Sequence, residues 1–239
     1  MIERRPYETL RASERSWLRA KHHFLFEGSE DAWGSLFIWN DDEIAPAGGF
    51  PAHPHANVEI ISYVQRGAVT HQDSLGNSGR TAAGDVQVLS AGAGIRHSEY
   101  NLETEPTQLF QIWIRPTAPG GAPAWGAKPF PKQDRAGRLV VLASGYDDDA
   151  DALPIRAQAR VLGATLTQGQ AVDYEASPGR YLYLVPAAGR VLVNGVEIDA
   201  RDGAAIKNVP HLTIFALEDS EIVLVDAPEA QSAAASRAA

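Results

Sequence analysis

The sequence predicts an all-β protein built as a barrel or sandwich of short strands. Runs of branched and aromatic residues are separated by turns rich in Gly, Asn, Asp and Pro, which recur about every eight to twelve residues. Turn residues of the first half, Gly67 and Gly84-Asp85, are echoed in the second half by Gly189 and Asp202-Gly203. Such an echo at about half the chain length indicates a duplicated unit.

Length and composition agree with this class. The 239 residues are about right for two domains of modest size, and 44% of them are hydrophobic, enough for a buried core. The 30 acidic residues against 21 basic ones give a net charge of −9, which argues against direct binding to nucleic acid. The chain has no cysteine and no apolar run of signal-peptide or membrane-spanning length. We therefore expect a soluble, cytoplasmic protein that does not enter a membrane.

In the first half, strands are expected wherever branched or aromatic residues cluster between turn residues. Residues 1–20 mix charged and polar side chains and give no such signal. Glycines at 48 and 49 suit a tight loop before the first histidine pair. The strands expected here cover residues 21–26, 33–40, 58–67 and 68–74, two further strands within 80–101, and 109–116.

The second half begins after a segment crowded with proline and glycine, residues 116–138, which shows no sustained periodicity and resembles a linker or a lid. Strand signals resume at LVVLASG and continue to about Val225. The tail EAQSAAASRAA has little to bury and is expected to be disordered. The predicted organisation is a first domain over 1–120, a linker over 121–138, a second domain over 139–228 and a tail over 229–239.

Two short clusters in the first half, His53-Pro54-His55 and His97-Ser98-Glu99, indicate a metal site. Residues two apart in a strand share a face. If two antiparallel strands bring the pairs opposite one another, His53, His55, His97 and Glu99 converge on one point. Three neutral nitrogens and one carboxylate suit a first-row divalent ion with positions left open for substrate, water or dioxygen.

Spacing alone does not identify which carboxylate would bind the metal. Strand alternation also turns Glu59 toward the face of His53 and His55, so Glu59 and Glu99 are both candidate ligands.

The remaining histidines have simpler interpretations. His22 and His23 are adjacent, so in a strand they face opposite ways and at most one can line a pocket. His71 is expected to pack or to form a hydrogen bond near Asp73, and His211 to be structural. A set of strand aromatics could line an apolar pocket but is more typical of plain core: Phe24, Phe26, Phe37, Trp39, Phe110 and Trp113.

The string GGFPAHPHANVEIISYVQRGAVTHQDSLGNSGRTAAGDVQVLSAGAGIRHSEYN closely resembles the metal-binding half of the pirin family, a branch of the cupin superfamily. The most discriminating pieces are HPH, DSLGNSG, GDVQ and SAGAGIRHSE, and the likeness extends over nearly the whole chain. The resemblance implies two tandem cupin barrels (double-stranded β-helix, jelly-roll) with the metal in the N-terminal one. It places the metal ligands at His53, His55, His97 and Glu99, and so favours Glu99 over Glu59. Ala56-Asn57 depart from the family pattern beside the pocket mouth, where substrate preference would be set.

The resemblance also implies an activity: a quercetin 2,3-dioxygenase type of enzyme that opens a flavonol ring with O2 and releases carbon monoxide. Glu99 would accept the proton of a substrate hydroxyl bound at one divalent metal ion, with Fe(II) expected and Mn, Ni, Co, Cu or Zn as alternatives. The expected partners are a small aromatic substrate and O2, on a monomeric protein. Two alternatives stay open: a metal-dependent transcriptional coregulator acting through a protein partner, and an enzyme acting on another small enol-type molecule.

Overall fold

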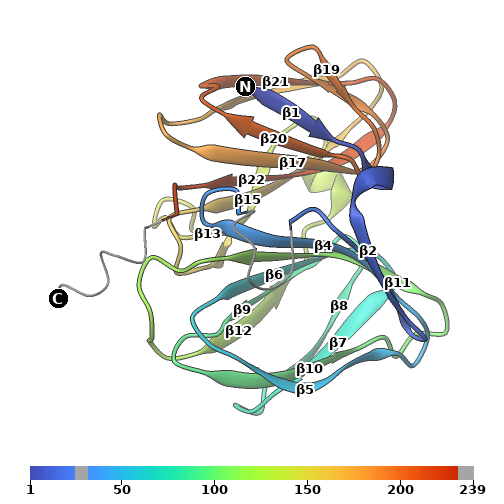
Figure 1. The fold of residues 1–239 in the computed structure, drawn as a ribbon, viewed down its shortest axis with the longest axis vertical. Helices are drawn as coiled ribbons and strands as arrows, with labels where there is room; N and C mark the ends of the chain where they lie inside the picture. The colour runs from blue at the N-terminus through green and yellow to red at the C-terminus, as the bar shows by residue number, and fades with distance from the viewer. Residues whose placement is uncertain (25–31, 231–239) are drawn as a thin grey trace.

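The computed structural model describes residues 1–24 and 32–230, which form two β-barrels lying one above the other in Figure 1. Each barrel pairs a seven-stranded sheet with a four-stranded one. The expected all-β fold of two barrels is therefore confirmed. Within these ranges no helix is both long enough and apolar enough to cross a membrane.

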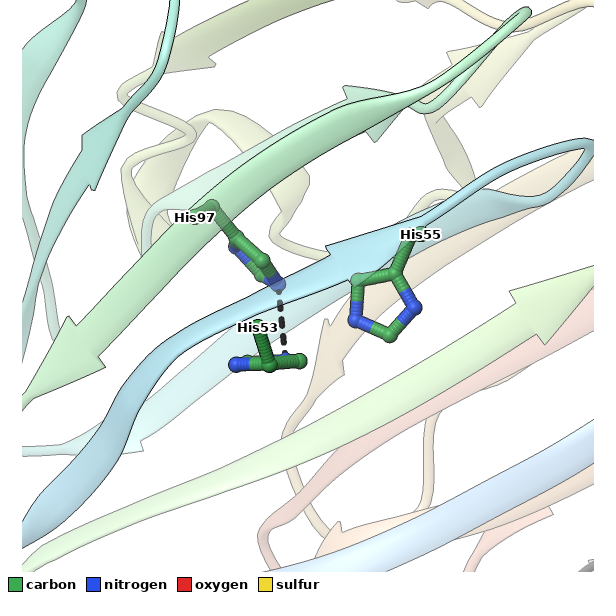
Figure 2. A group of neighbouring side chains, drawn as sticks. All are labelled: His53, His55 and His97. Atoms are coloured by element: carbon green, nitrogen blue, oxygen red, sulfur yellow. Dashed lines mark hydrogen bonds between the residues drawn. The ribbon is translucent and has the colours of Figure 1, made fainter.

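The first barrel consists of two antiparallel sheets, and most of its consecutive strands lie in different sheets. Its large sheet has the order β12 (Ala124–Lys128), β9 (Val86–Ser90), β6 (Glu59–Arg66), β11 (Thr107–Ile114), β4 (Leu36–Ile44), β3 (Leu18–His22) and β2 (Arg11–Arg15). Its small sheet has the order β5 (Gly49–His55), β10 (Ile95–Tyr100), β7 (Ala68–Asp73) and β8 (Ser78–Ala82). Strands β5 and β10 carry three histidines (Figure 2).

The second barrel repeats this plan. Its large sheet has the order β1 (Ile2–Arg5), β20 (Gly203–Lys207), β17 (Tyr181–Ala188), β22 (Ser220–Ala227), β15 (Arg160–Leu166), β13 (Val140–Ser144) and β14 (Leu153–Pro154). Its small sheet has the order β16 (Ala171–Glu175), β21 (His211–Ala216), β18 (Val191–Val193) and β19 (Val196–Ile198). Two short 3-10 helices, η1 (Tyr7–Thr9) and η2 (Lys132–Arg135), lie outside the sheets.

The interiors of the two barrels differ. One apolar cluster fills the second barrel, with buried side chains contributed by both of its sheets. The first barrel instead holds two smaller apolar clusters, one around Val64 and Leu109 and one around Ile60 and Leu89. The first barrel therefore has room for polar side chains and a cavity.

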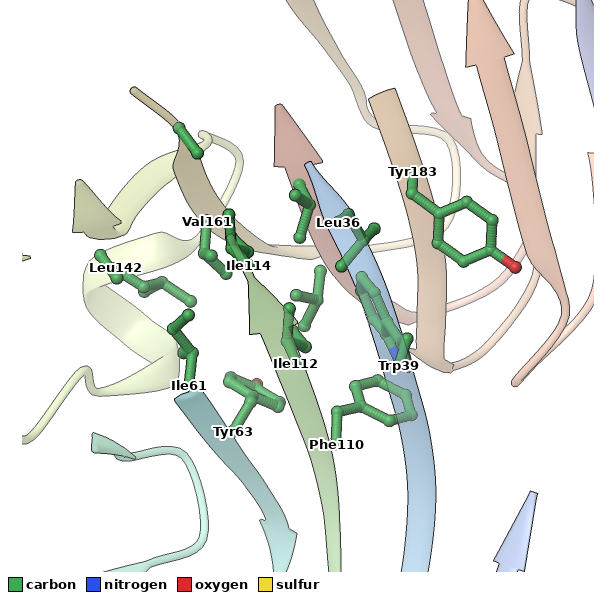
Figure 3. Close-up of a cluster of buried hydrophobic side chains, with 14 of the residues drawn as sticks. Leu36, Trp39, Ile61, Tyr63, Phe110, Ile112, Ile114, Leu142, Val161 and Tyr183 are labelled. Atoms are coloured by element: carbon green, nitrogen blue, oxygen red, sulfur yellow. The ribbon is translucent and has the colours of Figure 1, made fainter. Parts of the chain in front are cut away.

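The two large sheets pack face to face and form the largest apolar cluster of the molecule (Figure 3). Trp39 and Ile112 of the first barrel are fully buried in it, together with Tyr183 and Val223 of the second. A buried polar group borders this cluster: Arg135 donates to the hydroxyl of Tyr63 at 2.9 Å and to Glu221 at 3.3 Å. Extensive burial across the contact predicts that the two barrels stabilise one another.

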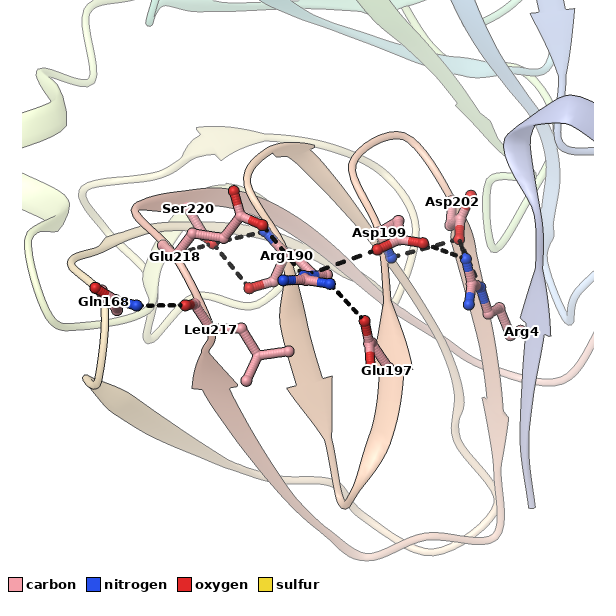
Figure 4. A network of polar contacts seen from close by, with 9 residues as sticks. All are labelled: Arg4, Gln168, Arg190, Glu197, Asp199, Asp202, Leu217, Glu218 and Ser220. Carbon is pink, nitrogen blue, oxygen red and sulfur yellow. Dashed lines mark hydrogen bonds and ion pairs between the residues drawn. The ribbon is translucent and has the colours of Figure 1, made fainter.

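The N-terminal strand belongs to the second barrel. Strand β1 pairs antiparallel with β20, with Ile2 opposite Ile206. Arg4 extends a polar network on this barrel by donating to Asp199 at 2.5 Å and to Asp202 at 2.6 Å (Figure 4). The described chain thus begins on one barrel and then crosses to the other.

The structure also differs from the sequence-based expectation in segments whose sequences carry only weak strand signals. Strands β1 to β3 begin within residues 1–20, where no strand was expected, and β12 lies inside the expected linker and pairs with β9. The strand expected over 21–26 is β3, which ends at His22; positions 25 and 26, including Phe26, lie outside the described residues. The expected disordered tail also lies outside them from position 231 onward.

Candidate metal centre

Strand β5 is an edge strand whose composition fits its position. It pairs only with β10 in the four-stranded sheet. Pro51 and Pro54 lack a backbone donor and are tolerated at such an edge. At Gly49 an added Cβ would lie 2.3 Å from the carbonyl oxygen of Glu99, so only glycine allows the two strands to approach this closely.

The register of β5 against β10 brings three imidazoles together. His53 lies opposite His97, and His55 lies opposite Ile95. The ring centroids are 4.5 Å apart for His53 and His97, 4.7 Å for His53 and His55, and 5.0 Å for His55 and His97 (Figure 2). One nitrogen from each ring lies within 4.8 Å of the others. The antiparallel pairing expected from the sequence is thus what positions these side chains.

The nitrogen geometry fits a divalent ion. The Nε2 atoms of His53 and His97 are 3.1 Å apart. Two nitrogens bound to one ion at about 2.0–2.1 Å would be about 2.8–3.4 Å apart for octahedral to tetrahedral angles. Nδ1 of His53 lies 2.7 Å from the carbonyl oxygen of Pro51, which fixes the proton there and leaves Nε2 free to bind. Nε2 of His55 is buried and has no hydrogen-bond partner among the described residues.

The protonation states also favour a cation. Burial, together with the neighbouring His53, lowers the pKa of His55 to about 4. Burial, together with the surrounding imidazoles, lowers the pKa of His97 to about 3. Both rings are therefore neutral at pH 7, and a neutral imidazole offers a lone pair to a metal ion.

Glu99 lies next to this group but is held differently. A β-bulge separates His97 from Glu99 in the pairing with β5. Gln87 and Gln111 donate to the two carboxylate oxygens at 2.5 Å and 3.0 Å. Burial raises the pKa of Glu99 to about 7, although these two hydrogen bonds oppose the shift. The potential ligand atoms of Glu99 group with those of His71 and His97, not with the three-imidazole set.

Glu59, the rival carboxylate, lies elsewhere. It is on β6 and accepts a hydrogen bond from the hydroxyl of Ser90. Among the described residues it belongs to neither group of potential metal ligands. The structure thus places Glu99, and not Glu59, beside His97.

His71 lies closer to the candidate metal centre than the sequence indicated, because it groups with His97 and Glu99. Its Nε2 lies 3.1 Å from Asp73, which confirms the expected hydrogen bond, and its ring stacks on Trp125 at 4.8 Å. It also lies opposite Glu99 across the β7–β10 pair. Gln87 and Gln111 were likewise not singled out from the sequence. The signal that could have found them is a glutamine inside an otherwise apolar strand, as in VQVLS and LFQIWI.

A cavity of about 640 Å³ opens beside the imidazoles. His53, His55, Glu99 and Trp113 line one part of it, and His22 lines another. His23 faces away and lies 3.0 Å from the hydroxyl of Tyr183 at the contact between the barrels, which confirms that only one of the adjacent histidines lines the pocket. Of the six candidate aromatics, Phe24, Trp39 and Phe110 belong to the core cluster, Phe37 packs beside Trp113, and Trp113 alone of the described ones lines this cavity. His211 lies on the surface beside Glu175.

Comparisons with known proteins agree with this architecture. The family model described as Pirin matches residues 4–114, and that described as Quercetinase C-terminal cupin domain matches residues 141–227. A pirin-like protein of Caulobacter vibrioides is 62% identical over 95% of this chain and 100% of its own length. The quercetin 2,3-dioxygenase of Escherichia coli is 36% identical over 89% of this chain and 92% of its own length.

The solved structures include a bacterial pirin of Escherichia coli, YhhW, in complex with nickel(II). It superposes with a TM-score of 0.89 at 33% identity, covering 96% of this chain and 100% of that one. Both barrels, and not only the first, are therefore shared with this neighbour. Because both halves match and the similarity to these relatives runs along nearly the entire chain, the protein belongs to the pirin family.

Proposed function

We propose that this protein is a metal-dependent dioxygenase that cleaves a flavonol such as quercetin. The observation that carries the proposal is the group of three imidazoles, two of which line a cavity large enough for such a substrate. The relative from Escherichia coli that is named a quercetin 2,3-dioxygenase supports the same reaction class. In the proposed reaction both atoms of O2 enter the substrate, the central ring opens, and one ring carbon leaves as carbon monoxide.

His53, His55 and His97 would hold the ion, and Glu99 is proposed as the fourth ligand. The proposed ion is Fe(II), although a donor set of nitrogen and oxygen also accepts Mn, Ni, Co, Cu or Zn. When bound, the ion supplies a Lewis acid that lowers the pKa of a substrate hydroxyl and a position for dioxygen.

The chain itself supplies binding and proton transfer. Trp113 and the apolar side chains of the cavity would contact the flat faces of the substrate and exclude water. Glu99 would accept the proton of the substrate hydroxyl, because a carboxyl with a pKa near 7 can take and release a proton near neutral pH. Gln87 and Gln111 hold both of its oxygens, so its position is fixed before the substrate binds.

The test is oxygen uptake and carbon monoxide release by protein reconstituted with Fe(II) in the presence of quercetin. We expect the two gases to change in a one-to-one ratio and His97→Ala to abolish both changes. His211→Ala, on the surface of the second barrel, is the matched control and should keep the activity. Turnover no faster than that of the free metal ion would refute the proposal.

A further inference from the structure

The cavity carries a second polar group, on strands other than those that hold the imidazoles. Asn40 and Asp42 are two apart on β4, so their side chains share one face of that strand, and both line the cavity. Asn40 lies opposite Gln111 across the β4–β11 pair, and Gln111 donates to Glu99. Asn40 is thus separated from Glu99 by a single residue, Gln111 of the neighbouring strand.

Hydrogen bonds fix the orientation of Asn40. Its Oδ1 lies 2.8 Å from Nδ1 of His22, and Nε2 of His22 lies 2.8 Å from the hydroxyl of Ser13. Because an amide oxygen only accepts, Nδ1 of His22 donates to Asn40. Asn40 therefore has its Nδ2 group left over, and no described residue provides an acceptor for it.

Asp42 presents the complementary atom. It is 1% exposed, and its Oδ1 has no hydrogen-bond partner in the described part of the chain. Its neighbour Asp41 faces the other way and pairs with Arg201 at 2.5 Å. Burial, followed by the nearby charges of Asp41 and Glu99, raises the pKa of Asp42 well above its ordinary value. A carboxyl oxygen accepts a hydrogen bond in either protonation state, and buried polar atoms without a partner are rare in native proteins.

We propose that Asn40 and Asp42 form a hydroxyl-binding subsite that selects polyphenols over aromatic enols without further hydroxyl groups. Oδ1 of Asp42 would accept from a phenolic hydroxyl, and Nδ2 of Asn40 would donate to a phenolic oxygen. The subsite would bind the part of the substrate remote from the imidazoles, while the enol lies at the metal. This inference rests on the proposed function for the orientation of the ligand, and it adds the class of substrate and the residues that select it.

The rest of the cavity wall suits the faces of a flat ring system. Its remaining wall is largely apolar and includes Leu18, Ala20, Ile38, Phe50 and Trp113. Such a wall binds aromatic faces but cannot distinguish hydroxylated rings from bare ones, because it offers no hydrogen bond at the ring edge. Discrimination therefore has to come from the polar side chains.

The test compares quercetin with 3-hydroxyflavone, which keeps the enol and lacks the other hydroxyl groups. Binding is measured on zinc-loaded protein without oxygen, by quenching of tryptophan fluorescence, since Trp113 lines the cavity. We expect wild-type protein to bind quercetin about 10- to 100-fold more tightly than 3-hydroxyflavone. In Asp42→Leu the preference should fall to within about threefold, chiefly through weaker binding of quercetin.

Glu43→Gln is the matched control, because Glu43 is next to Asp42, pairs with Arg19 and does not line this cavity. It should keep the full preference. Asn40→Leu is the second variant if Asp42→Leu does not fold, and it should reduce the preference in the same direction. No preference in wild-type protein, no binding of either compound, or a preference that survives both substitutions would overturn the subsite.

The same proteins separate this inference from the proposed function. If quercetin is preferred in binding but Fe(II) protein does not consume oxygen with it, the subsite stands and the dioxygenase proposal fails. If Fe(II) protein turns over quercetin and 3-hydroxyflavone with equal kcat/KM and binds them equally, the dioxygenase proposal stands and the subsite fails.

Discussion

His97 lies directly opposite His53 across the β5–β10 pair, and their Nε2 atoms are 3.1 Å apart. Neither atom belongs to a flexible loop, since both histidines are within paired strands. The paired strands therefore hold the two nitrogens at a separation that suits a shared ion, so we expect metal binding to need little rearrangement.

His53→Ala should weaken metal binding by more than about 100-fold, since it removes one of three imidazoles while replacements of supporting residues alone already cost 10- to 100-fold. Elemental analysis and calorimetric titration measure this. Metal at 1,000 times its Kd should raise the free energy of unfolding of the wild-type protein by about 4 kcal/mol and that of the variant far less. His22→Gln, in the same cavity but outside the group, should retain the metal. Equal affinity in His53→Ala and wild type would show that the ion binds elsewhere.

Glu99→Gln and Glu59→Gln separate the two candidate carboxylates. If Glu99 accepts the substrate proton, its replacement should lower kcat by roughly 10²- to 10⁴-fold, because an amide cannot take up a proton. Glu59 is bound to Ser90 and lies in neither ligand group, so its replacement should change kcat only a few-fold. The readout is steady-state oxygen uptake at matched iron content. The reverse ranking would assign the proton acceptor to Glu59.

Arg135→Met should destabilise the protein by about 2–3 kcal/mol, because it removes buried hydrogen bonds to Tyr63 and Glu221 at the contact between the barrels. Lys132 still pairs with Glu221 at 2.5 Å in this variant. Arg19→Met removes an exposed arginine from Glu43 and should cost less than about 1 kcal/mol. Urea unfolding of both variants measures the difference. Similar losses in the two would mean that the buried network contributes no more than a surface pair.

Ile112→Ala should cost about 2–5 kcal/mol, since the side chain is fully buried between the two large sheets. Because both barrels contribute to that cluster, calorimetry should show one unfolding transition that shifts as a whole to lower temperature. Two transitions, of which only one moves, would contradict this shared stability.

His23 should make the protein less stable in acid. Burial, with Arg5, Arg201 and His22 nearby, lowers the pKa of His23 to about 3 in the folded protein, while an unfolded chain titrates near about 6.5. Between these values the unfolded chain binds a proton that the folded chain does not. His23 alone should therefore contribute a loss of stability of up to about 1.4 kcal/mol per pH unit as the pH decreases from about 6.5 toward 3, and it should contribute no change above that window.

His23→Phe should flatten this slope, measured as the free energy of unfolding against pH. His211→Gln is the control: His211 is exposed and Glu175 raises its pKa, so removing it should leave the acid-side loss in place. An unchanged slope in His23→Phe would assign the acid sensitivity to other groups.

The sequence could predict the parts of this molecule that depend on strand alternation. The H-x-H pair and His97 follow the period of two that a strand imposes, so their convergence required only the antiparallel pairing of β5 and β10. His22 and His23 separated to opposite faces for the same reason.

What could not be predicted depends on contacts between distant segments. Strands β1 and β2 read IERR and RASER and have no buried apolar side chain, so no periodic signal marks them. Strand β12 is short and follows prolines and glycines, and its pairing with β9 is what makes it a strand. Strand alternation allows both Glu59 and Glu99 to face the imidazoles. Only the positions of β6 and β10 in the folded protein show which of the two carboxylates lies beside His97. Asp42 likewise became notable only when its oxygen proved to be buried without a partner among the described residues.

The position of β1 bears on how the protein is made. Its partner β20 lies roughly 200 residues downstream. At about 5–20 residues per second, the ribosome needs about 10–40 s to cover that distance. Strand β1 therefore leaves the ribosome well before its partner has been synthesised and cannot pair with it until then. The order in which this chain emerges is thus not the order in which its sheets can be completed.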